Sequence, residues 1–202
     1  EHVLMNKGFG YLSYDEAPIP VTVNTIYDVA SLTKIITTAP VLMKLIQKNR
    51  LDLDYPLYDF YDEFKVGEKS NVTIRHLLTH TAGLKAYREY YKTDILNRNE
   101  IIDDIINQDL VYSPDSLEKY SDLGMILLMD IIERVTNSTL DKLAEKYIYK
   151  PLGMNNTTFN PVYSSEINIA PTENDTYFRN QLLVGVVHDE NAFLLNGVSG
   201  HA

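Results

Sequence analysis

The chain has 202 residues, which suit one domain or part of a larger one, and its 45% hydrophobic and 23% charged residues are ordinary for a soluble globular protein. Its formal net charge of −10 at pH 7 argues against nucleic-acid binding, which relies on Lys and Arg to neutralise phosphate. The lack of cysteine excludes thiol catalysis, disulfides and cysteine metal sites, and no apolar run approaches the ~20 residues that span a membrane.

The first part of the chain is predicted to form strands. Residues 3–5 and 9–14 are rich in apolar and aromatic side chains, and the turn-prone residues 6–8 separate them. Residues 15–20 are predicted to form a loop that leads toward the next element.

A serine and a lysine stand three residues apart at the start of an apolar run. On a helix, Ser31 and Lys34 would lie on one face, one turn apart. Residues 35–45 are apolar on most sides, which predicts a helix buried in the core. Pro40 should kink this helix or end a segment of it, because proline has no N–H to donate. We expect the helix to end in the polar, turn-prone residues 51–56.

This pair could support nucleophilic catalysis. An inward-facing lysine is desolvated, which disfavours its charged form, and a neutral amine beside a serine hydroxyl can take its proton. Ser31 at the helix start would also feel the positive end of the helix dipole. The alternative is that Ser31 only caps the helix while Lys34 reaches solvent, since this spacing often occurs by chance.

Two histidines lie four residues apart in a predicted short helix, with Thr73 as its N-cap and Gly83 as its C-terminal stop. His76 and His80 could be metal ligands, but zinc needs three or four ligands and no third is obvious nearby. We therefore expect both histidines to be structural, with ring nitrogens bonded to backbone.

The second half is predicted to be helical and then irregular. Residues 99–106 form a short amphipathic pattern, residues 123–135 are strongly apolar, and Ser138 with Asp141 resembles a capping box that opens another helix. Residues 155–202 show few periodic runs. Within them, the polar residues 188–191 could line a substrate groove or bind a cation, but a solvated or structurally bonded loop is the favoured interpretation.

Four short motifs now appear in order, and together they resemble the serine β-lactamase-related family of class C β-lactamases, DD-peptidases and related esterases. The resemblance covers nearly the whole chain and implies an α/β fold, the α+β sandwich of β-lactamases and transpeptidases, with an antiparallel sheet and a helical region. The motifs are Ser31-Leu32-Thr33-Lys34, His76-Leu77-Leu78-Thr79-His80-Thr81-Ala82-Gly83-Leu84, Tyr120-Ser121-Asp122-Leu123-Gly124 and Pro151-Leu152-Gly153-Met154.

The resemblance implies a role for each matching catalytic position. Ser31 would be the nucleophile that becomes acylated, and Lys34 would be its base or proton relay. Tyr120 is similar to the tyrosine of the family's Tyr-x-Asn motif, which shuttles a proton between nucleophile and leaving group. The backbone N–H of Ser31 would supply half of an oxyanion hole. No metal or organic cofactor is implied.

One departure from the family lies at the substrate-binding position Asp122, where Asn is usual. Reading Ser121-Asp122 as the start of a Ser-Asp-Asn motif would place Leu123 where Asn belongs, so the register through Tyr120 is preferred. An acidic neighbour would favour the protonated form of Lys34, and an ionised Asp cannot donate to a substrate amide. Peptidase or esterase activity is therefore easier to accept than efficient β-lactamase activity. Asp122 could also cap the following helix.

A second departure is the absence of the family's third motif, Lys-Thr-Gly or His-x-Gly on an edge strand. We interpret residues 200–202, Gly-His-Ala, as an earlier turn of the family, so the closing C-terminal strands would be missing here. We expect a single incomplete domain, with residues 1–30 giving strands and lead-in and residues 31–202 a mostly helical region with loops. The missing segment would come from the same protein or from another chain, and exposed edges invite association.

The sequence therefore predicts a serine hydrolase that forms an acyl-enzyme with a small-molecule or peptide substrate. By resemblance, the substrate would be a cell-wall D-amino-acid peptide, a β-lactam or a small ester. The alternative is a non-catalytic, penicillin-binding-like binding or sensor module, which the retained Ser31, Lys34 and Tyr120 argue against and Asp122 weakly favours. The resemblance also implies a periplasmic or cell-surface location, with any signal peptide already removed from this chain.

Overall fold

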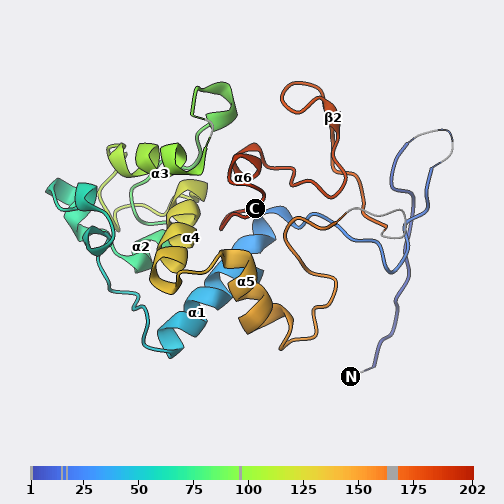
Figure 1. Cartoon of the computed structure of the whole chain (residues 1–202), viewed down its shortest axis with the longest axis horizontal. Helices are drawn as coiled ribbons and strands as arrows, with labels where there is room; N and C mark the ends of the chain where they lie inside the picture. Colours follow the sequence, from blue (N-terminus) through green and yellow to red (C-terminus); the bar gives the residue numbers. More distant parts are fainter. Residues whose placement is uncertain (1, 15, 17, 96, 163–167) are drawn as a thin grey trace.

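The computed structural model describes residues 2–14, 16, 18–95, 97–162 and 168–202. Helices gather on one side of the molecule, and mostly irregular segments occupy the other side (Figure 1). The helices and strands are α1 (Ala39–Gln47), α2 (Ile74–Leu78), α3 (Arg98–Asn107), α4 (Asp122–Thr136), α5 (Leu140–Ala144), α6 (Glu190–Leu194), β1 (Asn174–Asp175) and β2 (Gln181–Leu182). Short 3-10 turns cover Ala30–Leu32, Leu57–Asp59, Asp62–Phe64, Gly67–Asn71 and Tyr90–Lys92, and π-helical turns cover Lys34–Thr38 and Glu145–Tyr149.

Helix α4 is the centre of the core. Every residue from position 123 to 132 is buried, as expected of a helix that is apolar on all sides. The helix packs against α2, α3, α5 and the π-helical turn Lys34–Thr38. Ser121 caps its N-terminus by accepting the Gly124 N–H at 3.1 Å. The prediction of a helix here is confirmed, but Asp122 is its first residue and not its cap.

The segment that carries the Ser-x-x-Lys motif changes helix type twice. The 3-10 turn Ala30–Leu32 is followed by the π-helical turn, and α1 then begins one residue before Pro40. A boundary at proline is expected because proline cannot donate a backbone hydrogen bond. The segment is less enclosed than predicted, since Ile35 and Met43 are exposed while the opposite face of α1 is buried. Helix α1 ends at Gln47, a few residues before the predicted stretch.

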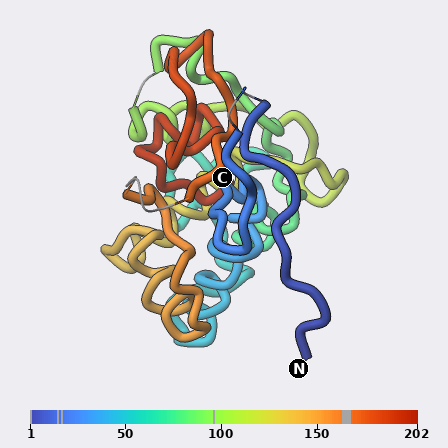
Figure 2. Tube along the Cα trace, turned by 90° about the vertical axis from the view of Figure 1, so that its right-hand side faces the viewer, coloured from blue at the N-terminus to red at the C-terminus, as the bar shows by residue number. Residues whose placement is uncertain are grey.

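The prediction of strands at residues 3–5 and 9–14 is wrong. In the described part of the N-terminal region, Tyr11 and Pro20 form an isolated antiparallel bridge, and residues 3–5 are largely exposed. A strand requires a partner along its length, and the N-terminal segment runs away from the helices along the edge of the molecule (Figure 2). Of the predicted loop, Asp15 and Ala17 lie outside the described residues.

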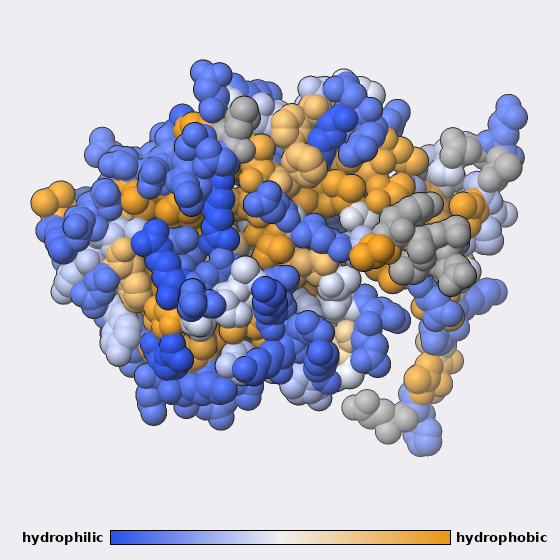
Figure 3. Space-filling model, in the orientation of Figure 1, coloured by the Kyte–Doolittle hydropathy of each residue, from blue (hydrophilic) through white to orange (hydrophobic). Residues whose placement is uncertain are grey.

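Regular pairing in the described residues is confined to a small antiparallel sheet. Strands β1 and β2 pair with Asn174 opposite Leu182 and Asp175 opposite Gln181. Hydrophobic surface is visible on the face drawn in Figure 3. The exposed apolar side chains of the molecule include Leu182 and Tyr11. Within the described ranges, none of the helices combines the length and apolarity that a bilayer crossing requires.

Two predicted helix ends differ from the structure. Thr73 caps α2 as predicted, but the helix ends at Leu78 and not at Gly83, which lies in the following loop. Helix α5 begins after Thr139, so the capping box at 138 and 141 is wrong. The reason is that Glu133 of α4 accepts the Leu140 N–H at 2.7 Å, so α4 supplies the cap. The short helix predicted at residues 99–106 is confirmed by α3.

The last described segment crosses α4 at Gly200. A Cβ on this residue would lie 2.3 Å from the carbonyl oxygen of Met125, which is too close for any side chain. On its other side, the Gly200 carbonyl accepts a hydrogen bond from Thr38 Oγ1 at 2.8 Å. Gly200 therefore sets how closely the segment packs between α4 and the π-helical turn.

Gly200→Ala should lower the free energy of unfolding by about 1–3 kcal/mol, because the added methyl group overpacks against the α4 backbone and forces the segment around residue 200 to shift. Gly124→Ala is the matched control. Its Cβ would meet its nearest atoms at 3.7 Å, in ordinary contact, and alanine suits a helix better than glycine. Urea denaturation of both variants measures the difference. Equal stability of the two variants would contradict the close approach at Gly200.

Candidate active site

Ser31 lies on a strained turn that exposes its side chain. Ala30 has a φ of +46°, a left-handed conformation that is costly for alanine. Its N–H donates to Asp28 Oδ1 at 2.7 Å, and Asp28 Oδ2 accepts the N–H of His188 at 2.9 Å. Strain of this kind persists only where surrounding contacts hold it, and it is frequent at functional sites. Asp28 thus ties the serine turn to the distant residue His188.

Lys34 points inward and is only 4% exposed. Its Nζ donates to Ser31 Oγ at 3.0 Å and to the His201 carbonyl oxygen at 2.7 Å, and it lies 2.7 Å from Asp122 Oδ1. An ammonium group has three donors and no acceptor, so three oxygen partners match the protonated amine. The structure contradicts the alternative of a lysine reaching solvent.

Asp122 reaches Lys34 from the first turn of α4. Its own N–H donates to the Ala86 carbonyl at 2.8 Å, which fixes the start of the helix. Its side chain is partly buried, and among the described residues the ion pair with Lys34 is the one polar contact found for Oδ1. A buried ion pair compensates charges that would be costly alone. The carboxylate is therefore engaged by Lys34 and not directed at open solvent.

Tyr120 borders the site with its ring. Lys34 Nζ lies 4.6 Å from the ring centroid, in a cation–π arrangement, and the ring is 4.7 Å from that of His80. The side chain is 51% exposed, and in the part of the chain that the structure describes no hydrogen bond of its hydroxyl group is found. The structure thus brings Tyr120 next to Lys34, with its ring face and not its hydroxyl toward the amine.

His80 supports the loop that carries Tyr120. It has a φ of +60°, and its Nδ1 accepts the Ser121 N–H at 3.2 Å. Burial and the positive charge of Lys34 lower the pKa of His80 below its ordinary value, so the ring is neutral at pH 7. A neutral ring is what a nitrogen that accepts a hydrogen bond requires. The predicted structural role, with a ring nitrogen bonded to backbone, is confirmed.

The other candidate polar groups are structurally bonded. His76 Nδ1 accepts the Thr73 N–H at 2.9 Å, and its Nε2 lies 2.9 Å from Asp115 Oδ2. In the region 188–191, Asp189 caps α6 and Asn191 donates to a backbone carbonyl, so these two side chains are structurally bonded as expected, but the expected loop is wrong at residues 190–191, which begin α6. The described residues contain no group of three or more His, Asp or Glu side chains arranged to hold a metal ion.

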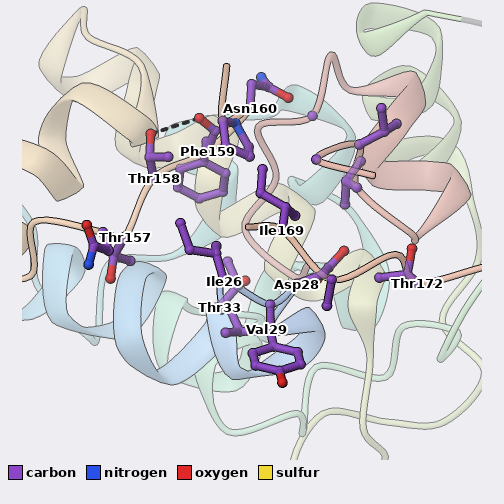
Figure 4. A pocket seen from close by; sticks show the side chains of 18 of the residues that line it. Ile26, Asp28, Val29, Thr33, Thr157, Thr158, Phe159, Asn160, Ile169 and Thr172 are labelled. Carbon is purple, nitrogen blue, oxygen red and sulfur yellow. Dashed lines mark hydrogen bonds between the residues drawn. The ribbon is translucent and has the colours of Figure 1, made fainter. Parts of the chain in front are cut away.

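A cavity of about 350 Å³ lies beside the serine turn (Figure 4). Asp28, Val29 and Thr33 line the side nearest the turn, and Ile26 and Ile169 give it apolar walls. Neither Ser31 nor Lys34 lines it. The cavity therefore neighbours the polar centre without containing it.

Sequence reasoning missed two contributors to this centre, Asp28 and the carbonyl of His201. An aspartate two residues before a strained turn gives a weak signal, because Asp side chains often accept nearby backbone N–H groups. The His201 carbonyl gives none, because every residue has one and only the fold decides which carbonyl meets Lys34.

Comparisons with known proteins bear on the family and on the fold. The family described as Beta-lactamase matches residues 1–198. A Salmonella agona protein named "Putative D-alanyl-D-alanine carboxypeptidase" is 32% identical over 232 residues, covering 100% of this chain and 54% of its own length. The chain thus spans about half the length of the curated relatives it matches.

Solved structures give the same fold. The octameric penicillin-binding protein homologue from Pyrococcus abyssi has a TM-score of 0.72 and 27% identity, covering 98% of this chain and 46% of that one. The penicillin binding protein from Bacillus halodurans has a TM-score of 0.67 and 26% identity, covering 80% of this chain and 50% of that one. The expected α/β fold of β-lactamases and transpeptidases, with helices and an antiparallel sheet, is confirmed.

The low pKa of His80 predicts a pH dependence of stability. The unfolded chain takes up a proton near pH 6.5, whereas the folded chain does so only at lower pH, so stability should fall as pH drops through this window. His80→Asn keeps an acceptor for the Ser121 N–H and tolerates the positive φ, but does not titrate.

Urea denaturation at pH 7.5 and pH 5 measures this effect. The wild type should lose more stability than His80→Asn between the two values. An equal loss in both proteins would show that His80 is not the responsible group.

Proposed function

The chain belongs to the beta-lactamase family, and from this we propose that it carries the nucleophile of a serine hydrolase that acts on an amide or ester through an acyl-enzyme. One observation carries the proposal: the exposed Ser31 Oγ lies 3.0 Å from the Nζ of the buried Lys34. Nucleophile and base candidates within hydrogen-bond reach are the signature of activated serine chemistry. We also propose that residues 1–202 form one part of a single domain.

In the first step, Ser31 Oγ attacks the substrate carbonyl carbon and loses its proton. The Lys34 ammonium cannot accept that proton until it has given one away. Asp122, at 2.7 Å, opposes this loss because its negative charge favours the ammonium form, so the proton passes to solvent before substrate closes the site. The neutral amine then faces Ser31 Oγ and receives the hydroxyl proton, and the tetrahedral adduct forms.

The second half of the cycle releases the products. The C–N or C–O bond of the substrate breaks, and the leaving group takes the proton that Lys34 received from Ser31. Tyr120 is the proposed relay for this proton, which requires its hydroxyl to turn toward the leaving group, because in the resting site its ring face lies against the amine. Water then attacks the acyl-serine ester and gives one proton to the neutral Lys34, which passes it to Ser31 Oγ as the ester bond breaks, so that the acid is released and Ser31 is restored. The Ser31 backbone N–H would stabilise the oxyanion in both tetrahedral adducts.

The substrate class we favour is a D-amino-acid peptide, a β-lactam or a small ester, with peptidase or esterase activity ahead of efficient β-lactam hydrolysis. The name of the Salmonella relative, a carboxypeptidase acting on D-alanyl-D-alanine, supports the peptide. Asp122 supports this order, because its carboxylate is occupied by Lys34 and has no donor for a substrate amide. We also propose a periplasmic or cell-surface location, since bacterial members of this family are usually exported.

A second candidate is a non-catalytic binding or sensor module with the same fold. The observation in its favour is that three oxygen atoms already occupy the three donors of Lys34. If substrate binding does not lead Lys34 to lose a proton, Ser31 would stay inert or become acylated without turnover. The hydrolase and the non-catalytic module differ in one event: only the hydrolase acylates Ser31 and then releases the acyl group.

Ser31 should be labelled by a fluorophosphonate in the full-length natural protein, giving one adduct by intact mass. Ser31→Ala should abolish the adduct, and Lys34→Met should slow labelling about 100-fold or more, as expected on loss of a proton acceptor. Ser116→Ala, at an exposed serine outside the site, is the control and should label like the wild type. Absence of an adduct in the wild type would favour the non-catalytic module.

Asp122→Asn should raise the rate of acylation by penicillin about three- to tenfold, because removing the opposing charge favours the neutral form of Lys34 and Asn can donate to the substrate amide. The rate is followed by intact mass at pH 7. A fall in rate would mean instead that Asp122 is needed as the proton acceptor for Lys34, and would reverse the assigned order of substrate classes.

A further inference from the structure

We propose that His201 is a positioning residue for Lys34, an inference that rests on the proposed function. Its backbone carbonyl is one of the three acceptors of the lysine, at 2.7 Å. Its side chain is held between Asp189 and Ser199. The side-chain contacts fix the carbonyl, and the carbonyl fixes Lys34 against Ser31.

The imidazole of His201 has a partner at each nitrogen. Nε2 donates to Asp189 Oδ1 at 2.8 Å, and Nδ1 is hydrogen-bonded to Ser199 Oγ. A carboxylate only accepts, so Nε2 carries a proton and donates it, while Nδ1 and the Ser199 hydroxyl share a hydrogen bond. His201 is 1% exposed, and Ser199 is 0% exposed. The ring cannot rotate without leaving a buried polar group unpaired, which is costly.

Asp189 is itself anchored to a helix. The oxygen that accepts from His201 also accepts the Ala192 N–H at 2.8 Å, so the same carboxylate caps α6. Burial pulls the pKa of Asp189 upward, but the hydrogen bond and electrostatic attraction of His201, with the N–H groups of Ala192 and Asn191, outweigh it and hold the pKa below its ordinary value. The carboxylate therefore stays ionised and remains a strong acceptor for Nε2–H.

The backbone beside His201 is also fixed. The preceding carbonyl, of Gly200, accepts from Thr38 Oγ1 at 2.8 Å, so two successive carbonyls meet the π-helical turn that carries Lys34. Figure 1 shows this end of the chain at the centre of the molecule, next to the start of the α1 segment. The side chain of His201 is a further restraint on the direction of its carbonyl.

Ser199, His201 and Asp189 are the residue types of a serine-protease triad, but they do not form a second nucleophilic site. Ser199 is inaccessible, so no substrate carbonyl could reach its hydroxyl group. The triad geometry here serves orientation instead. The held ring fixes the carbonyl of His201, and this carbonyl fixes Lys34. A displacement of Lys34 by near 1 Å from the productive geometry should slow acylation of Ser31 about 100-fold.

The test is the second-order rate constant for fluorophosphonate labelling of Ser31 in the full-length protein. His201→Phe keeps a ring but has no polar atom, whereas the amide nitrogen of His201→Gln can still donate to Asp189. Labelling should slow about 10- to 100-fold in His201→Phe and stay within about threefold of wild type in His201→Gln. This rescue distinguishes positioning from a general loss of packing.

His76→Phe is the matched control. It also removes a largely buried imidazole with a carboxylate partner, Asp115 at 2.9 Å, but His76 has no contact with the acceptors of Lys34 in the described residues. Its labelling rate should equal that of the wild type. If His201→Phe does not fold, Ser199→Ala gives the second measurement, and labelling should slow several-fold, by roughly 3- to 10-fold.

The outcomes separate the two proposals. Unchanged labelling in folded His201→Phe, or in Ser199→Ala where the former does not fold, overturns the positioning role and leaves the proposed function intact. Equal slowing in His201→Phe and His201→Gln also overturns it, because the bond to Asp189 would then not matter. If wild-type Ser31 is not labelled, the proposed function fails, and the inference that rests on it fails as well.

Discussion

The charged amine of Lys34 is the constraint on which the rest of the site depends. Removing an ammonium group from water is costly unless each of its hydrogens finds an acceptor and its charge finds a partner. The fold meets this requirement with the hydroxyl of Ser31, the carboxylate of Asp122 and the carbonyl of His201. Because these acceptors come from three distant parts of the chain, satisfying one lysine brings together the serine turn, the start of α4 and the segment after α6.

The core provides the rigid frame for this arrangement. Helix α4 is buried over ten consecutive positions and presents Asp122 at its first turn, so the carboxylate is fixed by the best-packed element in the molecule. The close approach of Gly200 to Met125 sets the position of the other acceptor segment. The strained conformation of Ala30 persists in such surroundings, because the hydrogen bonds of Asp28 hold the turn that exposes Ser31.

Local features could be predicted from the sequence, whereas contacts between distant segments could not. The pairing of Ser31 with Lys34 depends on a three-residue spacing, and it persists although the backbone there is 3-10 and then π-helical. The apolar residues of α4 likewise predict that this helix is buried. By contrast, the strands expected at residues 3–5 and 9–14 need partners that the sequence pattern cannot supply. The His201 carbonyl has no side-chain signature at all, so its contact with Lys34 appears only in the folded chain.

The separation of 167 residues between Lys34 and His201 has a consequence for biosynthesis. At about 5–20 residues per second, the ribosome adds the carbonyl that completes the lysine's environment roughly 8–33 s after the lysine itself. During that interval the nascent chain contains Ser31 and Lys34, but the His201 carbonyl that accepts from Lys34 has not yet been made. The environment of Lys34 can therefore be completed only after residue 201 has been made, and the Ser31–Lys34 pair stays without its third partner segment until then.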